Sequence, residues 1–128
     1  MSIEYEVNKK KILLIDDNVI QLRTLKVMLQ QKYSVEMATN CDDALIILKR
    51  SKPDMIFLDY EMPECNGKET LEKIRQMEGA ENIPVVFLTG VKDKENIAAV
   101  LKLNPAGYML KPAEQDKIME MAQKIIGS

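Results

Sequence analysis

Five short apolar runs, separated by amphipathic segments, constrain the fold of this chain more than any other feature. The runs cover residues 12–15, 35–38, 55–58, 85–88 and 108–110. Three of the runs are continuously apolar, as strands buried on both faces of a sheet must be. The second run alternates polar and apolar residues around Val35 and Met37, which is typical of an edge strand with one wetter face.

The segments between the runs have the periodicity of helices. Apolar side chains that share one helical face are Leu22, Leu25 and Leu29; Leu45 and Leu48; Leu71 and Ile74; Ile97, Val100 and Leu101; and Ile118, Met121, Ala122 and Ile125. Pro53 and the pair Asn104-Pro105 follow two of these segments, and proline ends a helix because it lacks an N–H. Asn40, three residues before Asp43, is typical of a helix start.

Alternation of strands and helices predicts an α/β fold, with a parallel sheet covered by helices on both faces. In such a sheet the carboxyl ends of the strands share one edge, where ligands bind. A length of 128 residues suits one domain. We expect a flexible flank over residues 1–9, one domain over residues 10–126, and no effector domain.

Composition excludes several classes of function. The chain has no His, which rules out His-based triads, His metal sites and His general bases. A net charge of -2 argues against nucleic acid as a partner. No apolar run approaches the ~18 residues that span a membrane, and residues 1–10 lack the apolar core of a signal peptide, so we expect a cytoplasmic protein. Cys41 and Cys65 lie far apart in the sequence, and we expect both to be reduced, without a redox role.

Polar side chains stand at the ends of four predicted strands: Asp16 and Asp17, Asp59, Thr89 and Lys111. Each alone is a common turn or cap residue, but their coincidence at one sheet edge favours a site. Three carboxylates that meet repel one another unless some are protonated or a cation lies between them. Carboxylates without imidazole or thiolate favour a hard cation, and few protein ligands favour Mg²⁺. A carboxylate nucleophile, Mg²⁺ and fixed donors are the parts of phosphoryl transfer.

These strand ends lie within a specific series of motifs. The motifs are ILLIDDN at 12–18, LDYEMPECNG at 58–67, LTG at 88–90 and YMLKP at 108–112. In this order they resemble the receiver domain of two-component response regulators, over about residues 10–126. The resemblance implies the flavodoxin-like, doubly wound five-stranded sheet with strand order 2-1-3-4-5.

The resemblance also implies a role for each site residue. Asp59 would be the phosphoacceptor, taking a phosphoryl group from a sensor histidine kinase or a histidine phosphotransfer protein. Asp17, Asp59 and the backbone carbonyl of Glu61 would bind Mg²⁺, with Asp16 reaching the ion through water. Lys111 would pair with the phosphoryl oxygens.

Thr89 and Tyr108 would form the switch, with Thr89 moving toward the phosphoryl group and Tyr108 rotating inward behind it. The implied signalling surface comprises residues 93–103, Gly107–Leu110 and residues 113–126. We expect it to bind a downstream protein, whose identity the sequence leaves open, and it is also a candidate surface for dimerisation.

Three positions depart from the pattern of the family. Glu61 can project over the phosphoryl site, Gly90 replaces the usual Ala or Ser after Thr89, and Cys65 replaces a larger apolar residue and is interpreted as packing. We expect Glu61 and Gly90 to affect the lifetime of the phosphorylated form.

Two other functions fit parts of the same pattern. One is an Asp-nucleophile phosphohydrolase, for which Glu61 would supply the second acid, although Pro63 and the lack of a cap insertion count against it. The other is an adaptor that works without phosphorylation, which the intact acidic residues and Lys111 disfavour. We expect a signalling module that modifies only itself, not an enzyme with a free substrate.

Overall fold

One parallel sheet organises the chain in the computed structural model, which describes residues 9–90 and 94–127. Its strands are β1 (Lys11–Ile15), β2 (Ser34–Ala38), β3 (Met55–Leu58), β4 (Val85–Thr89) and β5 (Gly107–Leu110). They pair in the order β2-β1-β3-β4-β5, and every pair is parallel. The predicted α/β fold and strand order are confirmed.

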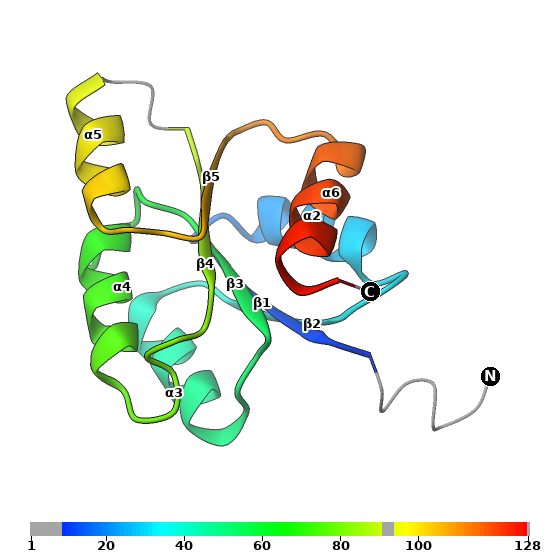
Figure 1. The fold of residues 1–128 in the computed structure, drawn as a ribbon, viewed down its shortest axis with the longest axis horizontal. Coiled ribbons are helices and arrows are strands. Elements are labelled where there is room, and N and C mark those ends of the chain that lie inside the picture. Colours follow the sequence, from blue (N-terminus) through cyan, green and yellow to red (C-terminus); the bar gives the residue numbers. More distant parts are fainter. Residues whose placement is uncertain (1–8, 91–93, 128) are drawn as a thin grey trace.

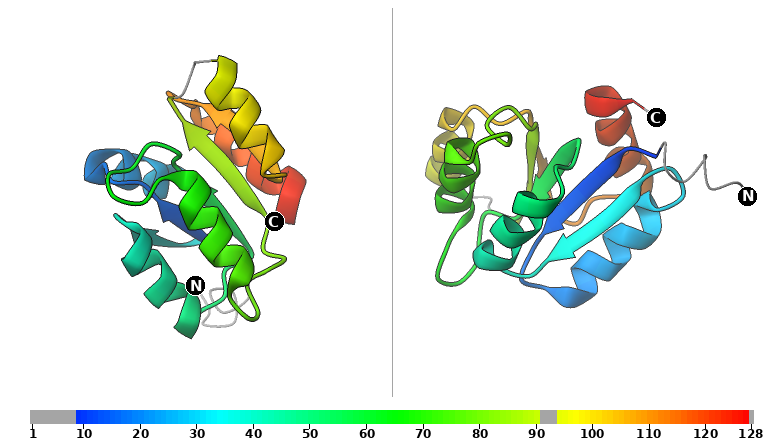
Figure 2. Two further views of the ribbon diagram at one scale, coloured as in Figure 1. Left: turned by 90° about the vertical axis from the view of Figure 1, so that its left-hand side faces the viewer. Right: turned by 90° about the horizontal axis from the view of Figure 1, so that it is seen from below.

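The helices cover both faces of the sheet (Figures 1 and 2). They are α2 (Val19–Leu29), α3 (Cys41–Arg50), α4 (Gly67–Gln76), α5 (Lys94–Lys102) and α6 (Gln115–Ile126). One core joins the sheet to α3, α4 and α5, and a second core joins the opposite face to α2 and α6. Because both faces are covered, β3 and β4 are buried along their whole length.

The edge position predicted for the second strand is confirmed, but its burial does not alternate. Val35, Glu36 and Met37 of β2 are all half-buried. Val35 and Met37 pack against the core of α2 and α6, while Glu36 lies 4.0 Å from Arg50 on α3. A strand with no neighbour on one side is covered incompletely, so both of its faces keep some contact with solvent.

One predicted helix face is partly wrong. In α5, Val100 is fully buried but Leu101 is 55% exposed, and Leu103, just after the helix, packs against the core instead. In α3, the predicted face is confirmed: Leu48 is buried, the half-buried Leu45 packs against the same core, and Ile47 joins them. Each residue turns a helix by about 100°, so a stripe assigned from a few apolar residues is easily displaced by one position.

The last helix begins later than the predicted residue 113. The backbone N–H of Lys111 donates to the carbonyl of Thr89 over 3.0 Å, which continues the pairing of β4 and β5 beyond the strand. The helix therefore starts only at Gln115. Residues 1–8 of the predicted N-terminal flank, and Asp93 at the start of the predicted signalling surface, lie outside the described residues. Across the described ranges, no helix has the length and apolar character needed to cross a bilayer.

Candidate functional site

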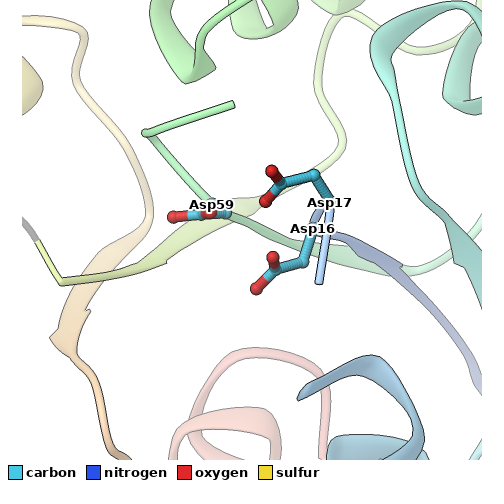
Figure 3. A group of neighbouring side chains, drawn as sticks. All are labelled: Asp16, Asp17 and Asp59. Carbon is cyan, nitrogen blue, oxygen red and sulfur yellow. The ribbon is translucent and has the colours of Figure 1, made fainter. Parts of the chain in front are cut away.

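Sheet hydrogen bonds bring the three predicted carboxylates together. The N–H of Asp59 donates to the carbonyl of Ile15 over 2.9 Å, and the N–H of Asp16 donates to the carbonyl of Ala38 over 3.1 Å. The ladder thus extends past the ends of β1 and β3 and fixes Asp16, Asp17 and Asp59 side by side (Figure 3). One carboxylate oxygen from each residue lies within 4.8 Å of the others.

Asp16 is buried, and both of its oxygens have partners. Oδ1 accepts the backbone N–H of Asn18 over 2.9 Å, and Oδ2 pairs with Lys111 Nζ at 2.5 Å. Asn18 also caps α2, because its side chain accepts the N–H of Gln21. The start of α2 and the strand end at Lys111 therefore hold this carboxylate from two sides.

Asp59 is 6% exposed and lies at the centre of the group. Lys111 Nζ is 3.5 Å from its Oδ2, and the backbone N–H of Glu61 donates to its Oδ1 over 3.4 Å. The side chain of Thr89, fully buried at the end of β4, also forms a hydrogen bond with this carboxylate. The structure therefore brings Thr89 and Lys111 to the acidic cluster, as predicted.

The surroundings of Asp59 disfavour its ionised form more than water does. Burial raises the pKa of this carboxyl, and the neighbouring charge of Asp16 raises it further. Lys111 and the hydrogen bonds from Thr89 and Glu61 lower the pKa, but the net direction is upward. An ionised Asp59 is thus a destabilised, partly desolvated anion, which a cation or an electrophile would stabilise.

The remaining predicted site residues, Glu61, Asp17 and Tyr108, differ in exposure. Asp17 and Glu61 are exposed, whereas Tyr108 is half-buried in β5 and packs against the core beneath α3, α4 and α5. Burial raises the pKa of the Tyr108 hydroxyl. Asp16, Asp17 and Asp59 together offer hard carboxylate oxygens, and Asp17 is exposed to solvent. Such a set of ligands can hold a divalent cation.

One positioning residue, Gly67, was not singled out for any physical role at the sequence level. It begins α4, and its N–H donates to the carbonyl of Tyr60 over 2.7 Å. A Cβ at this position would lie 2.7 Å from the Cα of Tyr60 and 3.0 Å from the carbonyl oxygen of Asp59. The segment that follows Asp59 can approach α4 this closely only because residue 67 has no side chain.

Comparison with known proteins identifies one family. A family model described as the response regulator receiver domain matches residues 12–123. A probable cyclic di-GMP phosphodiesterase of Vibrio cholerae is 33% identical over 112 residues, which are 88% of this chain and 25% of that protein. The probable transcriptional regulator ycf27 of Cyanophora paradoxa is 32% identical over 108 residues, which are 84% of this chain and 44% of that protein. The chain thus spans less than half the length of these curated relatives.

Solved structures agree with the fold. The chemotaxis protein CheY4 of Vibrio cholerae superimposes with a TM-score of 0.86 at 24% identity, over 92% of this chain and 99% of that chain. A two-component response regulator of Clostridium difficile gives a TM-score of 0.84 at 27% identity, over 92% of this chain and 96% of that chain.

We predict that Gly67→Ala destabilises the fold by about 1–3 kcal/mol, as overpacking at a tight contact does. Urea denaturation measures the change. Gly90→Ala is the matched control, because a Cβ at position 90 meets nothing within 4 Å, and its effect should stay within about 0.5 kcal/mol. Equal effects of the two substitutions would contradict the close approach at Gly67.

We also predict that Asp59→Asn stabilises the protein at pH 7, without divalent cations, by on the order of 1 kcal/mol. The pKa of Asp59 is raised in the folded state, so its ionisation costs stability as the pH rises through that pKa. The advantage of Asn should therefore shrink as the pH falls toward the ordinary aspartate pKa of about 4, because the folded protein takes up the Asp59 proton before the unfolded chain does. Denaturant titrations of both proteins across this range test the sign, and a wild type that is more stable at pH 7 would contradict it.

Proposed function

The chain belongs to the response regulator receiver family of two-component signalling, and on this premise we propose that Asp59 accepts a phosphoryl group from a phosphohistidine of a partner protein. The observation that carries the proposal is the buried Asp59 carboxylate, held between two other carboxylates and the Lys111 ammonium. A carboxylate oxygen of Asp59 would attack phosphorus as the bond between phosphorus and the imidazole nitrogen breaks.

Receiver domains bind Mg²⁺ at an acidic pocket, and the donor set of this chain fits that ion. Asp17, Asp59 and the backbone carbonyl of Glu61 would hold it directly. Asp16 would act through water, because both of its oxygens are already engaged by Asn18 and Lys111. When bound, Mg²⁺ neutralises charge that develops on phosphoryl oxygens.

Lys111 and Thr89 would serve the phosphorylated state. Both contact Asp59 before phosphorylation, so a phosphoryl group on its oxygen would offer them new anionic acceptors. Movement of Thr89 toward those oxygens would leave room beside β4, into which the half-buried Tyr108 ring of the neighbouring strand would rotate.

This change would be read on the surface formed by α5, β5 and α6. Leu101 on α5 and Leu110 on β5 are 55% and 45% exposed there, and exposed apolar side chains suit protein partners. The downstream partner would be a protein, or a second copy of this chain. A histidine kinase or a histidine phosphotransfer protein would supply the phosphoryl group, in the cytoplasm.

Phosphorylation by a small donor tests the proposal. Incubation with Mg²⁺ and acetyl phosphate should add one phosphoryl group to the wild type, seen by intact-mass spectrometry, and none to Asp59→Asn. Asp116→Asn, which alters an exposed acid on α6, should be labelled like the wild type. Equal labelling of Asp59→Asn would refute the assignment, and continuous phosphate release from small phosphomonoesters would favour a phosphohydrolase.

Metal binding gives a second test. Asp17→Asn should weaken Mg²⁺ binding by more than about tenfold, because even groups behind metal ligands are commonly worth that much. Glu61→Gln should leave the affinity nearly unchanged, since the proposed ligand there is the backbone carbonyl. Titration followed by NMR measures both constants, and a larger loss in Glu61→Gln than in Asp17→Asn would contradict this ligand set.

A further inference from the structure

The fold brings together the only two cysteines of the sequence, Cys41 and Cys65. Cys41 is the first residue of α3 and is 4% exposed, while Cys65 precedes α4 and is half-buried. Both line one open pocket together with Asn40, Pro63 and Lys73. Their separation in the sequence gave no sign of this, because it depends on the path of the loop between β3 and α4.

The hydroxyl of Thr70 lies beside Cys65. Its oxygen is 3.4 Å from Cys65 Sγ. The same hydroxyl donates its single hydrogen to the carbonyl of Asn66 over 2.9 Å, so the Cys65 thiol is the donor in their contact. Thr70 thus holds the Cys65 thiol beside the start of α4, and its hydroxyl also lowers the pKa of the Cys41 thiol.

The two thiols also affect one another. Burial raises the pKa of the Cys41 thiol, and the neighbouring Cys65 thiol raises it further. Together with the pocket that both residues line, this places the two side chains near one another. Two interactions hold the loop that carries Cys65 in place. The N–H of Cys65 donates to the carbonyl of Pro63 over 2.7 Å, and Asn66 forms a capping box with Glu69.

From this geometry we propose that Cys41 and Cys65 are a reversible redox pair, which a low-molecular-weight disulfide such as oxidised glutathione converts to an intrachain disulfide. This replaces our expectation that neither cysteine has a redox role. Cys65 is the more exposed and reacts first: its thiolate attacks a sulphur of the oxidant, and one glutathione thiolate leaves. Cys41, after losing its proton, attacks the Cys65 sulphur and displaces the second glutathione. The two protein thiols lose two electrons and two protons, and the oxidant gains them.

The disulfide would tie α3 to the loop between β3 and α4. That loop also contains Glu61, so the bond would restrain the segment beside the carboxylate cluster. A covalent link of this kind also restricts the unfolded chain, which stabilises the fold.

Peptide mapping of the full chain tests the proposal. Wild-type protein is equilibrated with oxidised glutathione under native conditions, quenched with acid, alkylated and digested with trypsin. The expected product is a single link between peptides 33–49 and 51–68, lost on treatment with dithiothreitol, in a monomeric protein. Cys41→Ser and Cys65→Ser should instead retain glutathione on the remaining cysteine or stay reduced.

A second readout keeps the proposal testable if a serine variant folds poorly. Oxidation of the wild type should raise its urea midpoint, and oxidation of Cys65→Ser should not. Asp59→Asn should form the disulfide as the wild type does, which separates this proposal from the proposed phosphorylation. Glutathione on both cysteines, links between chains, or unreacted thiols in the wild type would each overturn the proposal.

Discussion

The site depends on one constraint, which is the repulsion among three carboxylates. One oxygen of each lies within 4.8 Å of the others, at the edge of a parallel sheet whose hydrogen bonds bring them together. Sheet hydrogen bonds fix the backbones of Asp16 and Asp59, so these two buried residues stay close together. The structure offsets the repulsion with one ammonium, that of Lys111, and with N–H and hydroxyl donors from Asn18, Glu61 and Thr89. Burial of Asp59 and the charge of Asp16 together outweigh this offset, so the pKa of Asp59 remains raised. A site that keeps this imbalance is prepared for a cation and for an electrophile that removes negative charge from Asp59.

The same arrangement joins the chemistry to the surface. Thr89 ends β4 and Lys111 follows β5, so these two side-chain donors stand at the ends of the strands that lead to α5 and α6. Tyr108 pairs in register with Phe87 of β4 and packs against the core on the face of α3, α4 and α5. We propose that a charge change at Asp59 reaches the outer strands through these adjacent residues, with a stable alternative position of Thr89 and Tyr108 acting as the switch.

Much of this could be predicted from the sequence, since the controlling patterns are local. Continuous apolar runs identified β3 and β4, and the alternation with helices placed Asp16, Asp59, Thr89 and Lys111 at one sheet edge. Features that depend on packing were harder to predict. Leu101 is exposed because the helix α5 turns a different face to the core than predicted. The helix α6 begins later than predicted, after the hydrogen bond between Lys111 and Thr89 that continues the pairing of β4 and β5. The close approach at Gly67 and the pocket that Cys41 and Cys65 share both depend on the loop between β3 and α4. The path of this loop cannot be predicted from a periodic sequence pattern.

The chemical location of the phosphoryl group tests the central claim most directly. The protein is treated with phosphoramidate and Mg²⁺, and the acyl phosphate is then reduced with borohydride, which converts a phosphorylated aspartate to homoserine. Fragment sequencing by mass spectrometry then locates the change. The arrangement of the three carboxylates predicts homoserine at position 59 alone, with Asp16 and Asp17 unmodified. Reduction at Asp16 or Asp17, or a phosphoryl group that resists borohydride because it lies on a hydroxyl or an amine, would contradict the assignment of Asp59 as the acceptor.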